Sequence, residues 1–223
     1  MKPLVWFGPV WSGQVRASVP EGFSLHVVGC VAGVDPKHRR CVDEAAKWKD
    51  ASGRRLPGLR RALGLDVNAR PVLAAFSAGG QCVRRLLLDP RDRAEIGGVY
   101  LADASYGEWE NPGVVRVDEL QEALVSFAVE AAADGRPCVM TASAHVPGGG
   151  GPAASAVMQT LQAEMQGAGL CFGGVLVSPV LEGLSPISAE RSGSVLLVDF
   201  GREVAHAGHA TKIAPVLLPR VVG

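Results

Sequence analysis

Six short apolar runs alternate with segments of helical composition, and this alternation restricts the fold more than any other feature of the sequence. The runs have the length and residue types of buried strands and are apolar on both faces. Strands of this kind form mostly parallel sheets that helices cover on both sides. We therefore expect an α/β fold whose sheet has about six strands. The six expected strands are residues 4–7, 25–30, 72–76, 96–102, 137–141 and 195–200.

The segments between these runs have helical composition, and turn signals such as Asp35-Pro36 and Asp89-Pro90 separate them. We interpret Asp89-Pro90 as the end of a helix, and Gly135 as lying just past the end of another. The length of 223 residues suits a single domain over 1–223 with a sizeable core. The expected helices are residues 41–48, a short helical piece that ends at Leu65, and residues 79–88, 117–133, 153–166 and 211–222.

The composition excludes several classes of partner. The formal net charge is zero and no basic stripe is present, so neither nucleic acid nor an anionic membrane is expected as a partner. No apolar run approaches transmembrane length, and the N-terminal apolar run is too short for a signal peptide. The cysteines are odd in number and widely spaced. We interpret them as buried free thiols of a cytoplasmic protein, without a disulfide framework or a metal site.

The candidate site begins at the third apolar run, where Val72 to Phe76 breaks at Ser77 and a helical pattern follows. A serine in such a sharp strand-to-helix turn needs small residues two positions before and after it, and Ala75 and Gly79 meet this requirement. The turn exposes the Ser77 hydroxyl and directs the N–H of Ala78 toward a developing oxyanion. The alternative is a tight turn whose serine only caps the helix.

Two later strands also end in residues of catalytic type. Asp103 follows the fourth strand, where a carboxylate can orient an imidazole and stabilise its cation. His206 and His209 follow the sixth strand, where a general base for Ser77 is needed. We favour His206 because a loop position lets the ring reach both partners, and we keep His209 as the alternative base. Asp103 could instead cap a turn, and Asp199 and Glu203 are reserve acids.

The turn at Ser77 resembles the nucleophile elbow G-x-S-x-G of α/β-hydrolases, with alanine in place of the first glycine. The order Ser77, Asp103, His206 is also similar to the Ser…Asp…His order of that family. The resemblance implies a three-layer α/β-hydrolase-like sandwich, here a small core without a lid. Most members carry the acid after the next strand, and an acid in the position of Asp103 is a variation known in the family.

The family also takes a second oxyanion N–H from the loop after the first strand. Pro9 has no N–H, so Val10 or Trp11 must supply it, and we favour Val10. The usual His-Gly pair is absent from this loop. Large side chains follow strand ends on the same face and are candidates either for a substrate pocket or for rim packing. They are Trp11, Tyr106, Trp109 and His145.

These features favour a serine hydrolase that cleaves an ester or related acyl bond through an acyl-enzyme. The expected substrate is a small or acylated molecule, and no cofactor is expected. The alternative is a non-catalytic α/β-hydrolase-like protein that serves in binding or assembly, because a fold does not guarantee its usual chemistry. A third hypothesis is nucleotide binding at the same strand ends, where the turns Phe7-Gly8-Pro9 and Ser77-Ala78-Gly79-Gly80 could hold phosphate. Neither turn is followed by the G-K-[S/T] of a P-loop, and no G-x-G-x-x-G follows a strand.

Overall fold

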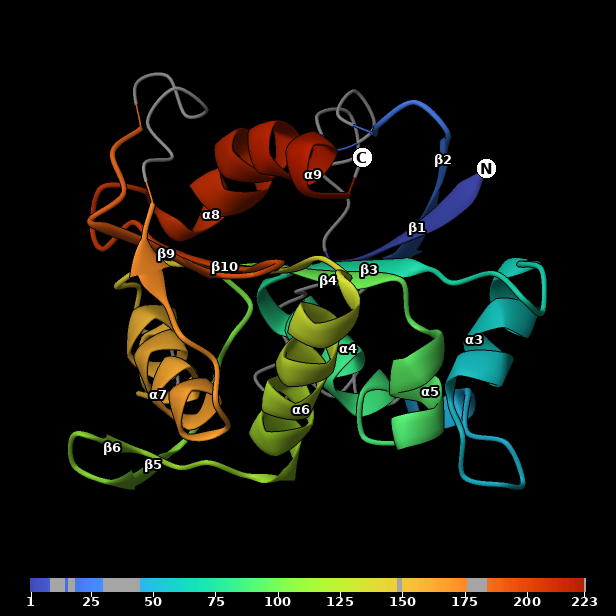
Figure 1. Cartoon of the computed structure of the whole chain (residues 1–223), viewed down its shortest axis with the longest axis horizontal. Coiled ribbons are helices and arrows are strands. Elements are labelled where there is room, and N and C mark those ends of the chain that lie inside the picture. The colour runs from blue at the N-terminus through green and yellow to red at the C-terminus, as the bar shows by residue number, and fades with distance from the viewer. Residues whose placement is uncertain (9–14, 16–18, 30–44, 148–149, 176–183, 223) are drawn as a thin grey trace.

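The protein is built on one mostly parallel sheet with helices on both faces (Figure 1). A computed structural model describes residues 1–8, 15, 19–29, 45–147, 150–175 and 184–222. Within this part of the chain the main sheet has eight strands, in the order β2-β1-β3-β4-β7-β10-β9-β8. The first six strands in this order pair in parallel, from β2 to β10. Strand β9 is antiparallel to β10, and β8 is antiparallel to β9.

The central strands are apolar because both of their faces are covered. Every residue of β3, β4, β7 and β10 is buried. Along β3, Leu73 packs into one hydrophobic cluster and Ala74 into the other, as the alternation of side chains in a strand requires. The strands are β1 (Lys2–Gly8), β2 (Phe23–Gly29), β3 (Val72–Phe76), β4 (Gly98–Ala102), β7 (Cys138–Ala142), β8 (Gly173–Gly174), β9 (Ser188–Ser192) and β10 (Val195–Asp199).

The helices form an outer layer on each side of the sheet (Figure 1). One layer contains α3 (Leu56–Leu63), α4 (Gly80–Leu86), α5 (Pro90–Glu95), α6 (Glu119–Asp134) and α7 (Ala154–Gly167). The other contains α8 (His206–Gly208), the π-helical turn η3 (His209–Ile213) and α9 (Ala214–Val222). A short 3-10 turn, η1 (Ser77–Gly79), joins β3 to α4. The α/β architecture expected from the alternating pattern is therefore confirmed.

Two elements differ from the sequence-based expectation. The sheet has eight described strands rather than about six, because β9 and β8 extend it beyond β10. Strand β9 reads Ser-Ala-Glu-Arg-Ser and has no buried residue, so it lacks the apolar run that marks a central strand. The pair Asp89-Pro90 does not only end a helix: it also begins α5, where the Asp89 side chain accepts from the Arg91 N–H.

A small hairpin of β5 (Trp109–Asn111) and β6 (Val114–Val115) lies apart from the main sheet. The expectation that the cysteines are buried free thiols is confirmed for Cys82 and Cys138 and is wrong for Cys171, which is exposed in the segment after α7. Cys30 and Cys41 lie outside the described residues. None of the described helices is both long and apolar enough to cross a membrane.

Candidate active site

The turn after β3 holds Ser77 in a backbone conformation that side chains rarely adopt. The φ angle of Ser77 is 54°, in the left-handed region, although the residue is not glycine. The next residues pass very close to neighbouring strand ends. A Cβ on Gly79 would lie 2.1 Å from the carbonyl oxygen of Phe7, and one on Gly80 would lie 2.1 Å from that of Ala104. The glycines thus let the turn fit between the ends of β1 and β4.

The Ser77 hydroxyl makes no hydrogen bond with any residue in the described part of the chain. Ala78 is in the first turn of η1, where a backbone N–H has no acceptor within the helix. Both groups are therefore free to contact a ligand beyond the strand ends. Val10 and Trp11, the expected donor of the second oxyanion N–H and its alternative, lie outside the described residues.

Asp103 and His206 meet at the carboxyl ends of the parallel strands. Asp103 directly follows β4, the neighbour of β3, and also has a positive φ, 46°. Its Oδ2 atom lies 2.6 Å from Nδ1 of His206. The carboxylate is fully buried, and the imidazole is 24% exposed. An ionised Asp103 favours the tautomer that carries its proton on Nδ1, which leaves Nε2 of His206 as a proton acceptor.

Ser143, which directly follows β7, supplies the other hydrogen bonds of Asp103. Its N–H donates to Oδ1 at 2.8 Å, and its hydroxyl donates to Oδ2 at 2.7 Å. Burial by itself would raise the pKa of Asp103, but the hydrogen bonds from His206 and Ser143 and the nearby histidines outweigh it. The pKa of Asp103 therefore lies below its ordinary value, and the carboxylate is ionised at neutral pH.

The ring of His206 lies between two other rings. Phe76, the residue before Ser77, stacks on it with ring centroids 4.6 Å apart, and His145 stacks on it with centroids 5.0 Å apart. The contact with Phe76 places the imidazole beside the turn that carries Ser77. The Tyr106 hydroxyl oxygen lies 3.0 Å from Nδ1 of His206. Because Nδ1 carries the proton shared with Asp103, the Tyr106 oxygen is a second acceptor for that proton.

His209, the alternative base, is buried on the side of the sheet that η3 and α9 cover. Its side chain is fully inaccessible, its Nδ1 atom lies 2.8 Å from the hydroxyl of Thr141, and its ring packs edge-on against Phe200. Its Nε2 atom has no hydrogen-bond partner within the described part of the chain. Burial lowers the pKa of His209 to about 4. A neutral ring with this environment is a core residue, and the structure gives it no contact with Ser77.

The remaining candidates lie at different distances from the Asp103–His206 pair. Tyr106 and His145 contact His206 directly. Trp109 is in the β5–β6 hairpin, 40% exposed, and its indole N–H donates to the carbonyl of Gly150. Asp199, a reserve acid, instead accepts from the Gly201 N–H, and burial raises its pKa. Glu203, the other reserve acid, is exposed.

Ser143 is the main residue of the site whose role the sequence did not reveal. Like Asp103, it is a polar residue directly after a buried strand. Its contact with Asp103 could be predicted only from the pairing of β4 with β7. Arg84 is a second such residue. Its buried guanidinium donates from Nη1 to the carbonyl of Tyr106, so α4 supports the loop that carries Tyr106.

This arrangement is suited to proton transfer and nucleophilic attack rather than to metal binding. Within the described residues, no group of three His, Cys, Asp or Glu side chains has the geometry to hold a metal ion. Ser77, Asp103 and His206 follow strands β3, β4 and β10, which end at one edge of the sheet. No model of a protein family matches this chain, and no curated protein was found to be similar to it.

Proposed function

We propose that the protein is a serine hydrolase that cleaves an ester or related acyl bond. The observation that carries the proposal is the 2.6 Å contact between Asp103 and His206 beside the strained turn at Ser77. A buried carboxylate on Nδ1 of an imidazole leaves Nε2 free to accept a proton, which is the role of the base in a Ser-His-Asp triad. Strain at Ser77 is typical of a serine held for reaction.

In the proposed reaction, Ser77 Oγ attacks the acyl carbon while Nε2 of His206 takes its proton. Asp103 holds the imidazole and stabilises the imidazolium, and the ring of Phe76 packs against the cation as it forms. The N–H of Ala78 stabilises the oxyanion together with a second N–H, which we assign to Val10. The imidazolium returns its proton to the leaving group, and water then releases the acyl group from Ser77.

We further propose that the fold is that of the α/β-hydrolases. The strand order β2-β1-β3-β4-β7-β10 supports this assignment, with the nucleophile after β3 and the base after β10. Asp103 follows β4, one strand earlier than the usual acid position. The strand that would usually carry the acid, β7, instead ends in Ser143, whose two hydrogen bonds hold Asp103 in place.

Hydrolysis of p-nitrophenyl esters of short and long acyl chains tests the proposal. Ser77→Ala and His206→Ala should each lower kcat by at least about a thousandfold, and Asp103→Asn should lower it by a similar factor because the wrong tautomer is favoured. As controls, Ser188→Ala removes a serine side chain from β9, and His26→Ala removes a histidine side chain from β2. Both variants should retain full activity. Activity that survives in Ser77→Ala would contradict the proposal.

A non-catalytic binding role is the second candidate, and one observation favours it. The Ser77 hydroxyl and Nε2 of His206 are not hydrogen bonded to each other, so the relay is open in this structure. In a hydrolase this contact closes when the substrate binds. A folded wild-type protein that hydrolyses none of the esters would support the binding role.

A further inference from the structure

Several arginines lie near the amino ends of the strands, away from the candidate active site, and have no part in the proposed reaction. The segment before α3, α3 itself and the loop after it carry Arg54, Arg55, Arg60, Arg61 and Arg70. The whole chain has a formal net charge of zero, so this concentration is a local asymmetry. Such an asymmetry calls for an explanation either in the folded structure or in a ligand.

Four of these arginines line a hollow of about 720 Å³, a volume suited to a small molecule. They are Arg54, Arg60, Arg61 and Arg70, and among the described residues Glu95 is the one acidic side chain in the lining. Pro57, Leu65 and Val67 give the hollow an apolar wall. Val67 is 74% exposed, which leaves its side chain free to cover part of a ligand.

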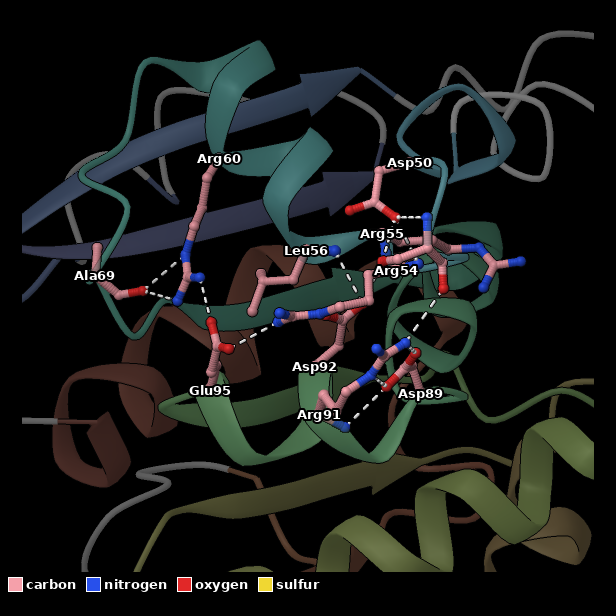
Figure 2. Close-up of polar contacts among 11 residues, drawn as sticks. Asp50, Arg54, Arg55, Leu56, Arg60, Ala69, Asp89, Arg91, Asp92 and Glu95 are labelled. Atoms are coloured by element: carbon pink, nitrogen blue, oxygen red, sulfur yellow. Dashed lines mark hydrogen bonds and ion pairs between the residues drawn. The ribbon is translucent and has the colours of Figure 1, made fainter.

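Glu95 is already neutralised by two of the arginines (Figure 2). Arg54 donates from Nη2 to Oε1 at 2.7 Å, and Arg60 donates from Nη1 to Oε2. Arg54 also donates from Nε to the buried carboxylate of Asp92 at 2.8 Å, and Arg60 donates to the carbonyl of Ala69 (Figure 2). These contacts fix both guanidinium groups and tie α3 to α5.

The other two arginines keep most of their donors unused. Arg70 donates from Nη2 to the carbonyl of Ala94 at 2.9 Å, which occupies one of its five N–H groups. Arg61 is exposed and makes no hydrogen bond or ion pair with a residue in the described ranges. The lining therefore has more positive charge than its own carboxylate balances, and guanidinium N–H groups remain free to bind an anion.

We propose that this hollow binds a small organic anion that carries at least two negative charges on phosphate or carboxylate groups. The planar guanidinium groups of Arg61 and Arg70 would bind its oxygens, since arginine pairs with both kinds of group through two parallel hydrogen bonds. Arg54 and Arg60, whose charges are balanced by Asp92 and Glu95, form a fixed wall of the hollow. The apolar part of the ligand would pack on Pro57, Leu65 and Val67.

The hollow is separate from the candidate active site. Arg70 lies shortly before β3 and Glu95 before β4, whereas Ser77 and Asp103 directly follow these strands. A five-residue strand spans roughly 17 Å, so the hollow lies at the amino ends of the strands and the candidate active site at their carboxyl ends. Binding of the anion is therefore expected in Ser77→Ala as well as in the wild type, and it does not depend on the proposed hydrolase activity.

Isothermal titration calorimetry with pyrophosphate and with citrate tests the proposal. We expect one binding site for at least one of the two probes, and the stronger probe indicates whether phosphate or carboxylate is the natural group. Arg61→Gln and Arg70→Gln should each weaken binding by roughly tenfold, because each removes hydrogen bonds to a charged group. Both side chains are exposed, so these variants should fold normally.

Arg116→Gln is the matched control, because Arg116 is exposed beside the β5–β6 hairpin and its ion pair in the described residues is with the exposed Glu108. It should bind the anion as the wild type does. The proposal is overturned if the wild type binds neither probe at an ionic strength of about 0.15 M. It is also overturned if Arg116→Gln weakens binding as much as Arg61→Gln, because the attraction would then come from charge in general.

Discussion

Asp103 is the residue on which the candidate site depends most. It is fully buried, and its two carboxylate oxygens receive three hydrogen bonds from Ser143 and His206. A buried carboxylate is stable only when its charge is compensated in this way. The positive φ of Asp103, 46°, is a second cost that the surrounding contacts must offset. Both features indicate that this carboxylate has a function beyond ending a strand.

Replacement of Ser143 by alanine tests how Asp103 is held. Ser143→Ala removes the O–H that donates to Oδ2, so the pKa of Asp103 should rise. In the proposed hydrolase, kcat should then fall by roughly tenfold, because Asp103 is held less firmly against His206. Esterase assays measure the fall in kcat. Ser188→Ala on β9 is the control, and an unchanged kcat in Ser143→Ala would argue against this role.

The sequence was informative for residues directly after central strands. Asp103 and His206 were expected to act together, and their side chains are in contact. The same reasoning favoured His206 over His209 because it expected a loop position for His206, whereas the structure places His206 at the first residue of α8. What distinguishes the two histidines is the direction in which each side chain faces, and the sequence does not give this. In the structure the His206 side chain contacts Asp103 at the carboxyl ends of the strands, and the His209 side chain is buried against Thr141.

At the scale of elements, the unit formed by β3, η1 and α4 sets the position of Ser77. The turn fits between β1 and β4 only because Gly79 and Gly80 have no side chains. Both glycines have helical φ angles, so what they supply here is space rather than conformational freedom. The unit is thus a close packing of three strand ends against the first turn of a helix.

Gly79→Ala should destabilise the protein strongly. Its Cβ would meet the carbonyl oxygen of Phe7 at 2.1 Å, and backbone on both sides would have to move. We expect a loss of about 3 kcal/mol or more in the free energy of unfolding. Urea denaturation measures the change. Gly167→Ala, at the end of α7, is the matched control because a Cβ there meets nothing within 4 Å. A Gly79→Ala variant as stable as this control would contradict the packing described here.

The sequence predicted the elements that have a strong hydrophobic signal and missed the others. The expected central strands 72–76 and 195–200 correspond to β3 and β10 within one residue at each end. Strand β9 was missed because it is polar and none of its residues is buried. Helix α5 was missed because it is only six residues long, which is too short for a helical periodicity to be recognised.

At the scale of the whole molecule, the two layers of helices differ in how they hold polar groups. The layer of η3 and α9 buries His209 against Thr141 of β7 and Phe200 after β10. Nε2 of this ring has no hydrogen-bond partner among the described residues, so a proton on it would be buried without an acceptor. His209 thus makes the stability of the molecule depend on pH.

The sign of this dependence follows from the pKa of His209, which burial lowers to about 4. Between about pH 6.5 and 4 the unfolded chain takes up a proton that the native state does not bind. The free energy of unfolding should therefore fall as the pH falls through this window. The loss reaches roughly 3 kcal/mol by pH 4 and is absent at pH 7.

Urea denaturation at several pH values measures this contribution. In His209→Asn the fall between pH 6.5 and 4 should be smaller than in the wild type by the same amount. His26→Asn, on strand β2, is the control and should keep the slope of the wild type. An equal slope in the wild type and in His209→Asn would mean that His209 takes up its proton without a cost to the fold.

The order of the strands was beyond what the sequence alone could predict. The contact between Asp103 and Ser143 joins residues forty positions apart, and it exists because β4 and β7 are neighbours. Such non-local pairing depends on how all the helices pack, and no short pattern encodes it. The alternation of strands and helices is local and was therefore predictable.

The central claim is that Ser77 is an activated nucleophile, and labelling with a fluorophosphonate probe tests it most directly. We expect stoichiometric labelling of the wild type, with the adduct on Ser77 in the mass spectrum of the digested protein. Labelling should be lost in Ser77→Ala and in His206→Ala and retained in Ser188→Ala. A folded wild-type protein that remains unlabelled, or an adduct on another residue, would contradict the claim.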